Sequence, residues 1–163
     1  MATKRSAGIL LFRDREGGRT EFLLVHPGGP YWAKRDDGAW SIPKGGIEGD
    51  EDSREAALRE LDEELGAAAP QLEPADLIDL GSIRQRAGKL VDAWAAKGDF
   101  DPADLDSNTF NMEWPPKSGR QIDFPEVDRA AWFDLETARR KLLPAQGEFL
   151  DRLLEHLGRT VAR

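Results

Sequence analysis

The segment from Trp40 to Ala67, WSIPKGGIEGDEDSREAALRELDEELGA, restricts the fold more than any other part of the chain. It begins with a Pro-Lys-Gly-Gly turn at 43–46 and passes through an acidic loop into a predicted helix. Asp52 is a suitable N-cap, Glu55 completes a capping-box pattern, and Gly66 supplies the stop. This segment therefore predicts an irregular glycine turn followed by one well-defined helix.

Three carboxylates gather on one side of that helix. Glu60, Glu63 and Glu64 stand at spacings i, i+3 and i+4, beside an apolar stripe at Ala57, Leu61 and Leu65. Like charges at these spacings oppose each other by roughly 0.2–0.5 kcal/mol per pair, and we expect the nearby arginines to lie outside the group. A hard divalent cation such as Mg²⁺ accepts oxygen ligands and would relieve the repulsion better.

The spacing of these residues resembles the signature box of the Nudix hydrolases, G-x5-E-x7-R-E-U-x-E-E-x-G-U. Here Gly45 is followed after five residues by Glu51, and after seven more by Arg59-Glu60-Leu61-x-Glu63-Glu64-x-Gly66. Only Ala67 departs from the pattern, where a larger aliphatic residue is usual. The resemblance implies an α+β fold, a Nudix-type α/β/α sandwich with a mixed sheet.

The resemblance also implies roles for the residues of the box. Glu60, Glu63 and Glu64 are the expected catalytic ligands of Mg²⁺ or Mn²⁺, with the Lys44 carbonyl as a backbone ligand. Glu51 and Arg59 would form a salt bridge between loop and helix. Gly45 would let the main chain approach the metal closely, and Gly66 would end the helix.

The general base and the substrate contacts come from outside the box. We expect Glu113 to be the catalytic base, with Glu60 as the alternative; otherwise Glu113 points to solvent while its neighbours Met112 and Trp114 point inward. Lys44 is expected to contact phosphate. A nucleobase needs an aromatic platform, and Tyr31 and Trp32 in a Gly-Pro loop are the candidates. Trp40 and Phe110 are expected in the core.

Length and charge limit the remaining classes of protein. The 163 residues suit a single domain, 1–163, and the formal net charge of −8 argues against general nucleic-acid binding. Cysteine is absent, and no apolar run reaches the length of a membrane span or signal peptide. We therefore expect a cytoplasmic protein acting on a small phosphoanhydride, with no membrane partner; a homodimer is compatible with the sequence.

The remaining elements follow from periodicity and turn residues. We expect a hairpin of 7–12 with 21–26, a strand pair of 77–86 with 89–97, and an acidic surface loop at 98–108. The loop could serve as a lid, as a dimer contact or have no role. Other predicted elements are a loop at 27–37, strands at 40–42, 109–114 and 127–133, and helices at 136–143 and 147–157.

The substrate is less constrained than the chemistry. The lead-in Trp40-Ser41-Ile42-Pro43-Lys44-Gly45 resembles that of Nudix enzymes acting on dinucleoside polyphosphates such as diadenosine tetraphosphate, and it recurs in RNA 5′-pyrophosphate and diphosphoinositol relatives. We rank a dinucleoside polyphosphate first, nucleoside triphosphates second and ADP-sugars third. A non-catalytic Nudix-like nucleotide sensor is the alternative from another class, although the complete carboxylate set favours an enzyme.

Overall fold

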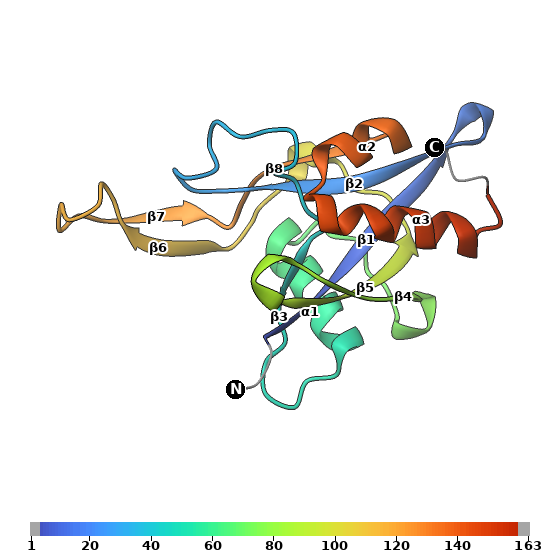
Figure 1. The fold of residues 1–163 in the computed structure, drawn as a ribbon, viewed down its shortest axis with the longest axis horizontal. Coiled ribbons are helices and arrows are strands. Elements are labelled where there is room, and N and C mark those ends of the chain that lie inside the picture. The colour runs from blue at the N-terminus through green and yellow to red at the C-terminus, as the bar shows by residue number, and fades with distance from the viewer. Residues whose placement is uncertain (1–3, 160–163) are drawn as a thin grey trace.

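A mixed β-sheet forms the centre of the computed structural model, which describes residues 4–159 (Figure 1). Its strands run in the order β4-β5-β1-β2-β8, and the short β3 also pairs with β1. Only β1 and β5 are a parallel pair among the strand pairs of the described chain. The bounds are β1 Arg5–Arg15, β2 Arg19–Pro27, β3 Lys44–Gly46, β4 Ile78–Arg84, β5 Leu90–Lys97 and β8 Val127–Phe133.

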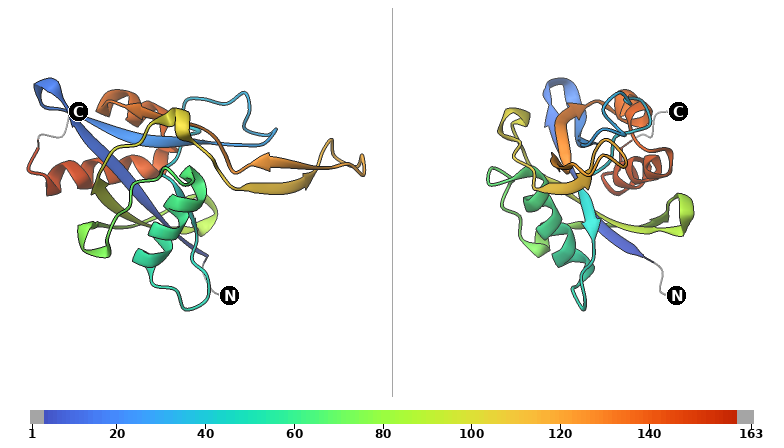
Figure 2. Two further views of the ribbon diagram at one scale, coloured as in Figure 1. Left: turned by 180° about the vertical axis from the view of Figure 1, so that it is seen from behind. Right: turned by 90° about the vertical axis from the view of Figure 1, so that its left-hand side faces the viewer.

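Helices cover both faces of this sheet. The helix α1 (Ser53–Leu65) packs on one face, and α2 (Leu135–Lys141) and α3 (Gly147–His156) pack on the other (Figures 1 and 2). Alternate residues of β1 enter separate cores: Ile9 and Leu11 belong to the core under α1, whereas Leu10 and Phe12 belong to the core under α2 and α3. The expected α+β sandwich with a mixed sheet is confirmed.

Two strands, β2 and β3, pair with different parts of β1. β2 pairs with residues 12–15 of β1, and β3 pairs with residues 6–8. Part of the predicted turn at 43–46 is thus a strand. The expected strand at 40–42 forms only isolated bridges, between Ser41 and Val25 and between Trp40 and Leu142.

A second sheet of two strands projects from the body as a hairpin (Figure 1). It consists of β6 (Thr109–Glu113), which was predicted, and β7 (Gln121–Pro125), which was not. Five residues ending in proline give too short a pattern to distinguish a strand from a loop. The chain then returns from β7 through Glu126 directly into β8.

The acidic loop 98–108 closes the end of α1. The Asp106 and Asn108 amides donate to the carbonyls of Leu65 and Glu63, each at 3.0 Å. Gly66 has a φ of 93°, and a Cβ there would lie 2.6 Å from the Asp106 carbonyl oxygen. The loop therefore satisfies carbonyls that the helix end leaves free. No helix within residues 4–159 has the length and apolar character needed to cross a bilayer.

Candidate active site

The helix α1 begins and ends where the sequence indicates. The Asp52 carboxylate accepts a hydrogen bond from the Arg54 amide at 3.2 Å, so Asp52 is the N-cap. A capping box would pair each of Asp52 and Glu55 with the other's amide, and neither bond is present among the described residues, so the predicted capping box is not formed. This cap fixes the rotation of α1 at its start, and the buried stripe of Ala57, Leu61 and Leu65 fixes which face meets the sheet.

The strand β3 touches two of the three helix carboxylates. The Lys44 amide donates to Oε2 of Glu64 at 3.0 Å. The Gly45 Cα lies against the Glu60 carboxyl group so closely that an added Cβ would be 2.1 Å from its Oε2. The turn and the helix face thus meet at one point, and only glycine fits at position 45 without displacing Glu60.

Burial perturbs the charged groups at this meeting point. Glu64 is only 8% exposed, and burial followed by the charge of Glu60 raises the pKa of Glu64 well above its ordinary value. Burial also raises the pKa of Glu60, although Arg59 opposes the shift. Burial lowers the pKa of Lys44 despite the attraction of Glu64. Burial thus disfavours the ionised form of both carboxyl groups at this point.

Arg59 lies among the carboxylates, which corrects the expectation that it stands outside them. Its guanidinium pairs with both oxygens of Glu51 at 2.8 and 3.0 Å. Nη1 also donates to Glu60 at 2.9 Å and to Glu63 at 3.1 Å, and Nη2 donates to the Gly46 carbonyl at 2.9 Å. The loop-to-helix salt bridge implied by the resemblance is thus present, and the same side chain also neutralises two proposed metal ligands.

The donor set suits a hard divalent cation. Mg²⁺ takes oxygen ligands, and the carboxylates of α1 and the main-chain carbonyls of β3 offer them. As they stand, the side chains of residues 4–159 form no cluster of three acidic or imidazole groups that would enclose a metal unaided. One guanidinium nitrogen, Nη1 of Arg59, occupies the space between Glu60 and Glu63, while the Glu51 pairing uses the other nitrogens. The carboxylates of Glu60 and Glu63 could turn from Nη1 to a cation while Nε and Nη2 of Arg59 keep their bonds to Glu51.

Glu113 does not lie at this site. It ends β6 in the projecting hairpin, is exposed, and its carboxylate accepts a hydrogen bond from the Lys117 amide at 2.7 Å. Met112 and Trp114 are half-buried on either side of it, as the solvent-facing alternative requires. Its position therefore argues against the expected role as general base.

Glu126 is the acidic residue that sequence reasoning missed. It follows β7, and its negative charge contributes to raising the pKa of both Glu60 and Glu64. Its backbone is held on two sides, since its amide donates to Asn108 at 2.8 Å and its carbonyl accepts from Gly28 at 2.9 Å. The available sequence signal was an acid immediately before a predicted strand, which is too common to single out.

A cleft with two compartments surrounds Glu126. One compartment, about 310 Å³ in volume, is lined by Ser41, Lys44, Glu64 and Gln85 among others. The second, about 440 Å³, is lined by Tyr31, Trp32, Phe110 and Met112 among others. Pro27, Trp32 and Glu126 line both compartments. Phe110 therefore faces a cavity instead of the core, whereas Trp40 is buried as expected.

Most of the chain matches a known protein family. The model described as the NUDIX domain matches residues 2–153. An RNA pyrophosphohydrolase of Bartonella henselae is 28% identical over 149 residues, covering 82% of this chain and 78% of that protein. RNA pyrophosphohydrolases of Acidiphilium cryptum and Gluconacetobacter diazotrophicus are 61% and 43% identical over 33 and 67 residues. Those two matches cover 20% and 39% of this chain, but only 20% and 36% of the relatives' own lengths.

Solved structures share the fold at low sequence identity. An Ap4A hydrolase of C. elegans, described as a binary complex, is 24% identical with a TM-score of 0.63, covering 94% of this chain and 98% of that one. The NUDIX domain of Shewanella oneidensis NrtR complexed with ADP ribose is 19% identical with a TM-score of 0.64, covering 96% and 90%. At these identities the likeness concerns the arrangement of strands and helices.

Proposed function

The chain belongs to the Nudix family, and from that membership we propose that it is a metal-dependent pyrophosphohydrolase that cleaves a phosphoric anhydride with water. The observation that carries the proposal is the contact of β3 with the carboxylates of α1. Lys44 and Gly45 bring main chain to Glu64 and Glu60, at a point where burial and mutual repulsion leave excess negative charge. A divalent cation would join these carboxylates to an anionic substrate.

Glu60, Glu63, Glu64 and the Lys44 carbonyl would hold Mg²⁺ or Mn²⁺. When bound, such an ion lowers the pKa of a coordinated water and neutralises charge on phosphate oxygens. Arg59 keeps α1 fixed to the loop through Glu51, so the ligands on the helix stay in register with the turn. At the C-terminal end of α1, Gly66 leaves room for the acidic loop, whose amides bond the last carbonyls of the helix.

The chain's own groups supply substrate binding and proton transfer. Lys44 lines the smaller compartment, and its ammonium group is the expected phosphate contact. Because Glu113 lies away on the hairpin, we assign the general base to Glu126, an acid outside the box whose charge acts on both Glu60 and Glu64. Glu60 is the alternative base. A water-derived proton would pass to a carboxylate oxygen of the base as the anhydride opens.

A dinucleoside polyphosphate such as diadenosine tetraphosphate is the first-ranked substrate. The compartment with Lys44 suits the polyphosphate, and Tyr31 and Trp32 in the other compartment provide an aromatic platform for one base. An RNA 5′-pyrophosphate is the second candidate, favoured by the relative that matches 82% of this chain. Nucleoside triphosphates and ADP-sugars remain lower in rank, and the nucleotide sensor is the non-catalytic alternative.

Product analysis in ¹⁸O-labelled water would test the proposal. The panel contains diadenosine tetraphosphate, 5′-triphosphorylated RNA, nucleoside triphosphates and ADP-ribose, each with Mg²⁺ or Mn²⁺ and with chelator. We expect chelator-sensitive release with ¹⁸O in one phosphate product, and fastest turnover of diadenosine tetraphosphate. Tight nucleotide binding with no hydrolysis of any member would instead identify a sensor.

A further inference from the structure

The loop after β2 leaves an aromatic side chain in an unusually open position. Tyr31 is 60% exposed, and Trp32 beside it is half-buried. This loop runs alongside the projecting hairpin, and the views of Figures 1 and 2 agree on that arrangement. The 440 Å³ compartment lies between the two segments. A cavity lined mainly by aromatic and apolar side chains with few polar groups is typical of a ligand pocket.

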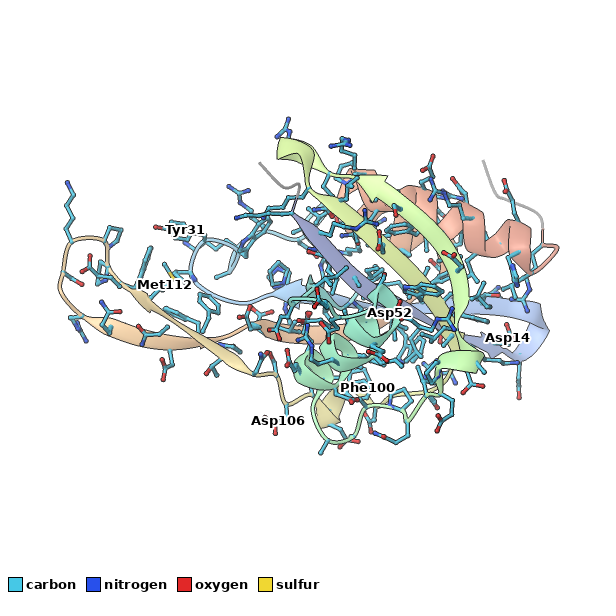
Figure 3. The ribbon with its side chains drawn as sticks, turned by 90° about the horizontal axis from the view of Figure 1, so that it is seen from below. Asp14, Tyr31, Asp52, Phe100, Asp106 and Met112 are labelled. Carbon is cyan, nitrogen blue, oxygen red and sulfur yellow. The ribbon has the colours of Figure 1, made fainter. Side chains whose placement is uncertain are left out.

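The hairpin turns its apolar face toward this loop. Phe110 and Met112 are half-buried and line the compartment, whereas the intervening Asn111 and the following Glu113 are exposed. Tyr31 and Met112 appear on the facing segments in Figure 3. The alternation of a strand thus places apolar side chains on the cavity side and polar ones on the solvent side.

Contacts between loop and hairpin set the width of the compartment. The Tyr31 ring meets Trp114 edge to face with centroids 5.3 Å apart. A Cβ on Gly29, whose φ is 95°, would lie 2.9 Å from the Phe110 ring, so the loop main chain approaches the hairpin as closely as glycine allows. An isolated two-stranded hairpin is only marginally stable, and these contacts hold it in place.

Charge distinguishes the two compartments. Glu126 is the charged residue lining the aromatic compartment, and it stands where that compartment joins the one containing Lys44 and Glu64. Phosphate groups therefore belong near Lys44 and the metal ligands. The aromatic compartment suits a flat uncharged ring, because every nucleobase has a π-face that stacks on aromatic side chains.

We infer that the β6–β7 hairpin is one wall of a nucleobase slot, in which Phe110 and Met112 hold a base of the substrate against Tyr31 and Trp32. The inference rests on the proposed function and narrows it to substrates that carry a base next to the cleaved polyphosphate. A dinucleoside polyphosphate and the 5′ end of a triphosphorylated RNA both offer such a base. An anhydride without a base would use the Lys44 compartment alone.

Steady-state kinetics of Met112→Ala and Tyr31→Ala test the slot. For a base-bearing substrate we expect KM to rise by at least about fivefold in either variant, with kcat nearly unchanged, because a stacked base loses one wall. Inorganic tripolyphosphate, used as a base-free competitor, should inhibit both variants and the wild type equally. Gln121→Ala, on the exposed face of the same hairpin, is the matched control and should keep the wild-type KM.

Two substrates distinguish the source of the base. If the KM effect appears with diadenosine tetraphosphate, the slot serves a dinucleoside polyphosphate; if it appears only with triphosphorylated RNA, it serves an RNA end. An unchanged KM for both would overturn the slot, as would an equal change in tripolyphosphate inhibition. Circular dichroism melting of each variant shows whether the hairpin change disturbs the fold.

Binding of AMP separates failure of the slot from failure of the proposed function. AMP has no anhydride, so it remains intact, and its base should shift the indole ¹H–¹⁵N resonances of Trp32 and Trp114 in the wild type. Ribose 5-phosphate should not shift them. If AMP shifts these signals in a protein that hydrolyses nothing, the enzyme proposal fails and the slot stands. Unmoved signals in an active enzyme overturn the slot alone.

Discussion

Replacing Gly45 by alanine should separate catalysis from stability. The added Cβ would lie 2.1 Å from the Glu60 carboxyl group, whereas ordinary contact begins near 3.4 Å, so the carboxylate must move by about 1 Å or more. The obstructing atoms are the end of a flexible side chain, and Gly45 has no positive φ. The helix and β3 can therefore stay in place while the proposed metal ligand leaves its position.

The two expected magnitudes differ widely. A displacement of about 1 Å in a catalytic group costs roughly 100-fold in rate, so we expect kcat to fall by about that factor. For stability, the lost Arg59–Glu60 ion pair removes about 0.2–1 kcal/mol, and the Gly→Ala gain in the unfolded state returns about 0.4–1 kcal/mol. The free energy of unfolding should therefore change by less than about 1 kcal/mol.

The assay compares Gly45→Ala with Gly46→Ala. A Cβ on Gly46 has no atom within 4 Å, so this neighbouring variant should retain wild-type kcat. We would measure Mg²⁺-dependent hydrolysis of diadenosine tetraphosphate and urea unfolding for both. Wild-type kcat in Gly45→Ala, or an equal loss in Gly46→Ala, would refute the assignment of Glu60 to the site.

Three other predictions concern the carboxylates, the helix end and acid stability. Glu63→Gln and Glu64→Gln should each lower kcat at least ~100-fold with unchanged circular dichroism, because metal clamping supplies several kcal/mol. Gly66→Ala should destabilise the fold by about 1–2 kcal/mol or more in urea unfolding, because its φ is positive and loop backbone blocks the Cβ. The Arg159 hydrogen bond lowers the pKa of Asp14 from 3.8 to about 2. Asp14 is exposed, so its pair should add about 0.2–1 kcal/mol above pH 4 and lose it toward pH 2; urea unfolding of Asp14→Asn should then differ from wild type at pH 6 and converge on it in acid.

Local signals account for what could be predicted from the sequence. The helix at 53–65 has its cap, its apolar stripe and its terminating glycine within fifteen residues, so no distant contact is needed to define it. The same holds for the β1–β2 hairpin and the strand at 127–133. The pairing of Glu51 with Arg59 came from the family pattern, whose spacing encodes a contact made within one loop and helix.

Arg59 shows where such local reasoning ends. Arg59 and Glu63 are four residues apart, a spacing that allows contact on a helix. The bond from Arg59 to the adjacent Glu60 depends on the position of the Glu60 carboxylate, which packs against Gly45 of β3. Gly45 touches Glu60 only because β3 pairs with the first residues of β1, more than thirty positions earlier in the chain. Helix periodicity alone could not place the Arg59 guanidinium, because it also bonds the Gly46 carbonyl of β3.

A distant chain contact also explains why the proposed general base is Glu126 and not the expected Glu113. Both are acids in extended segments, and alternation shows only which face of a strand each occupies. Whether that face meets the helix depends on the hairpin leaving the body at Asn108 and returning at Glu126, where the two main chains bond at 2.8 Å. That closure carries Glu113 outward with the hairpin and leaves Glu126 at the junction of both compartments. The residue at the base of a projecting hairpin is therefore the stronger candidate for chemistry, and those along its apolar face are candidates for recognition.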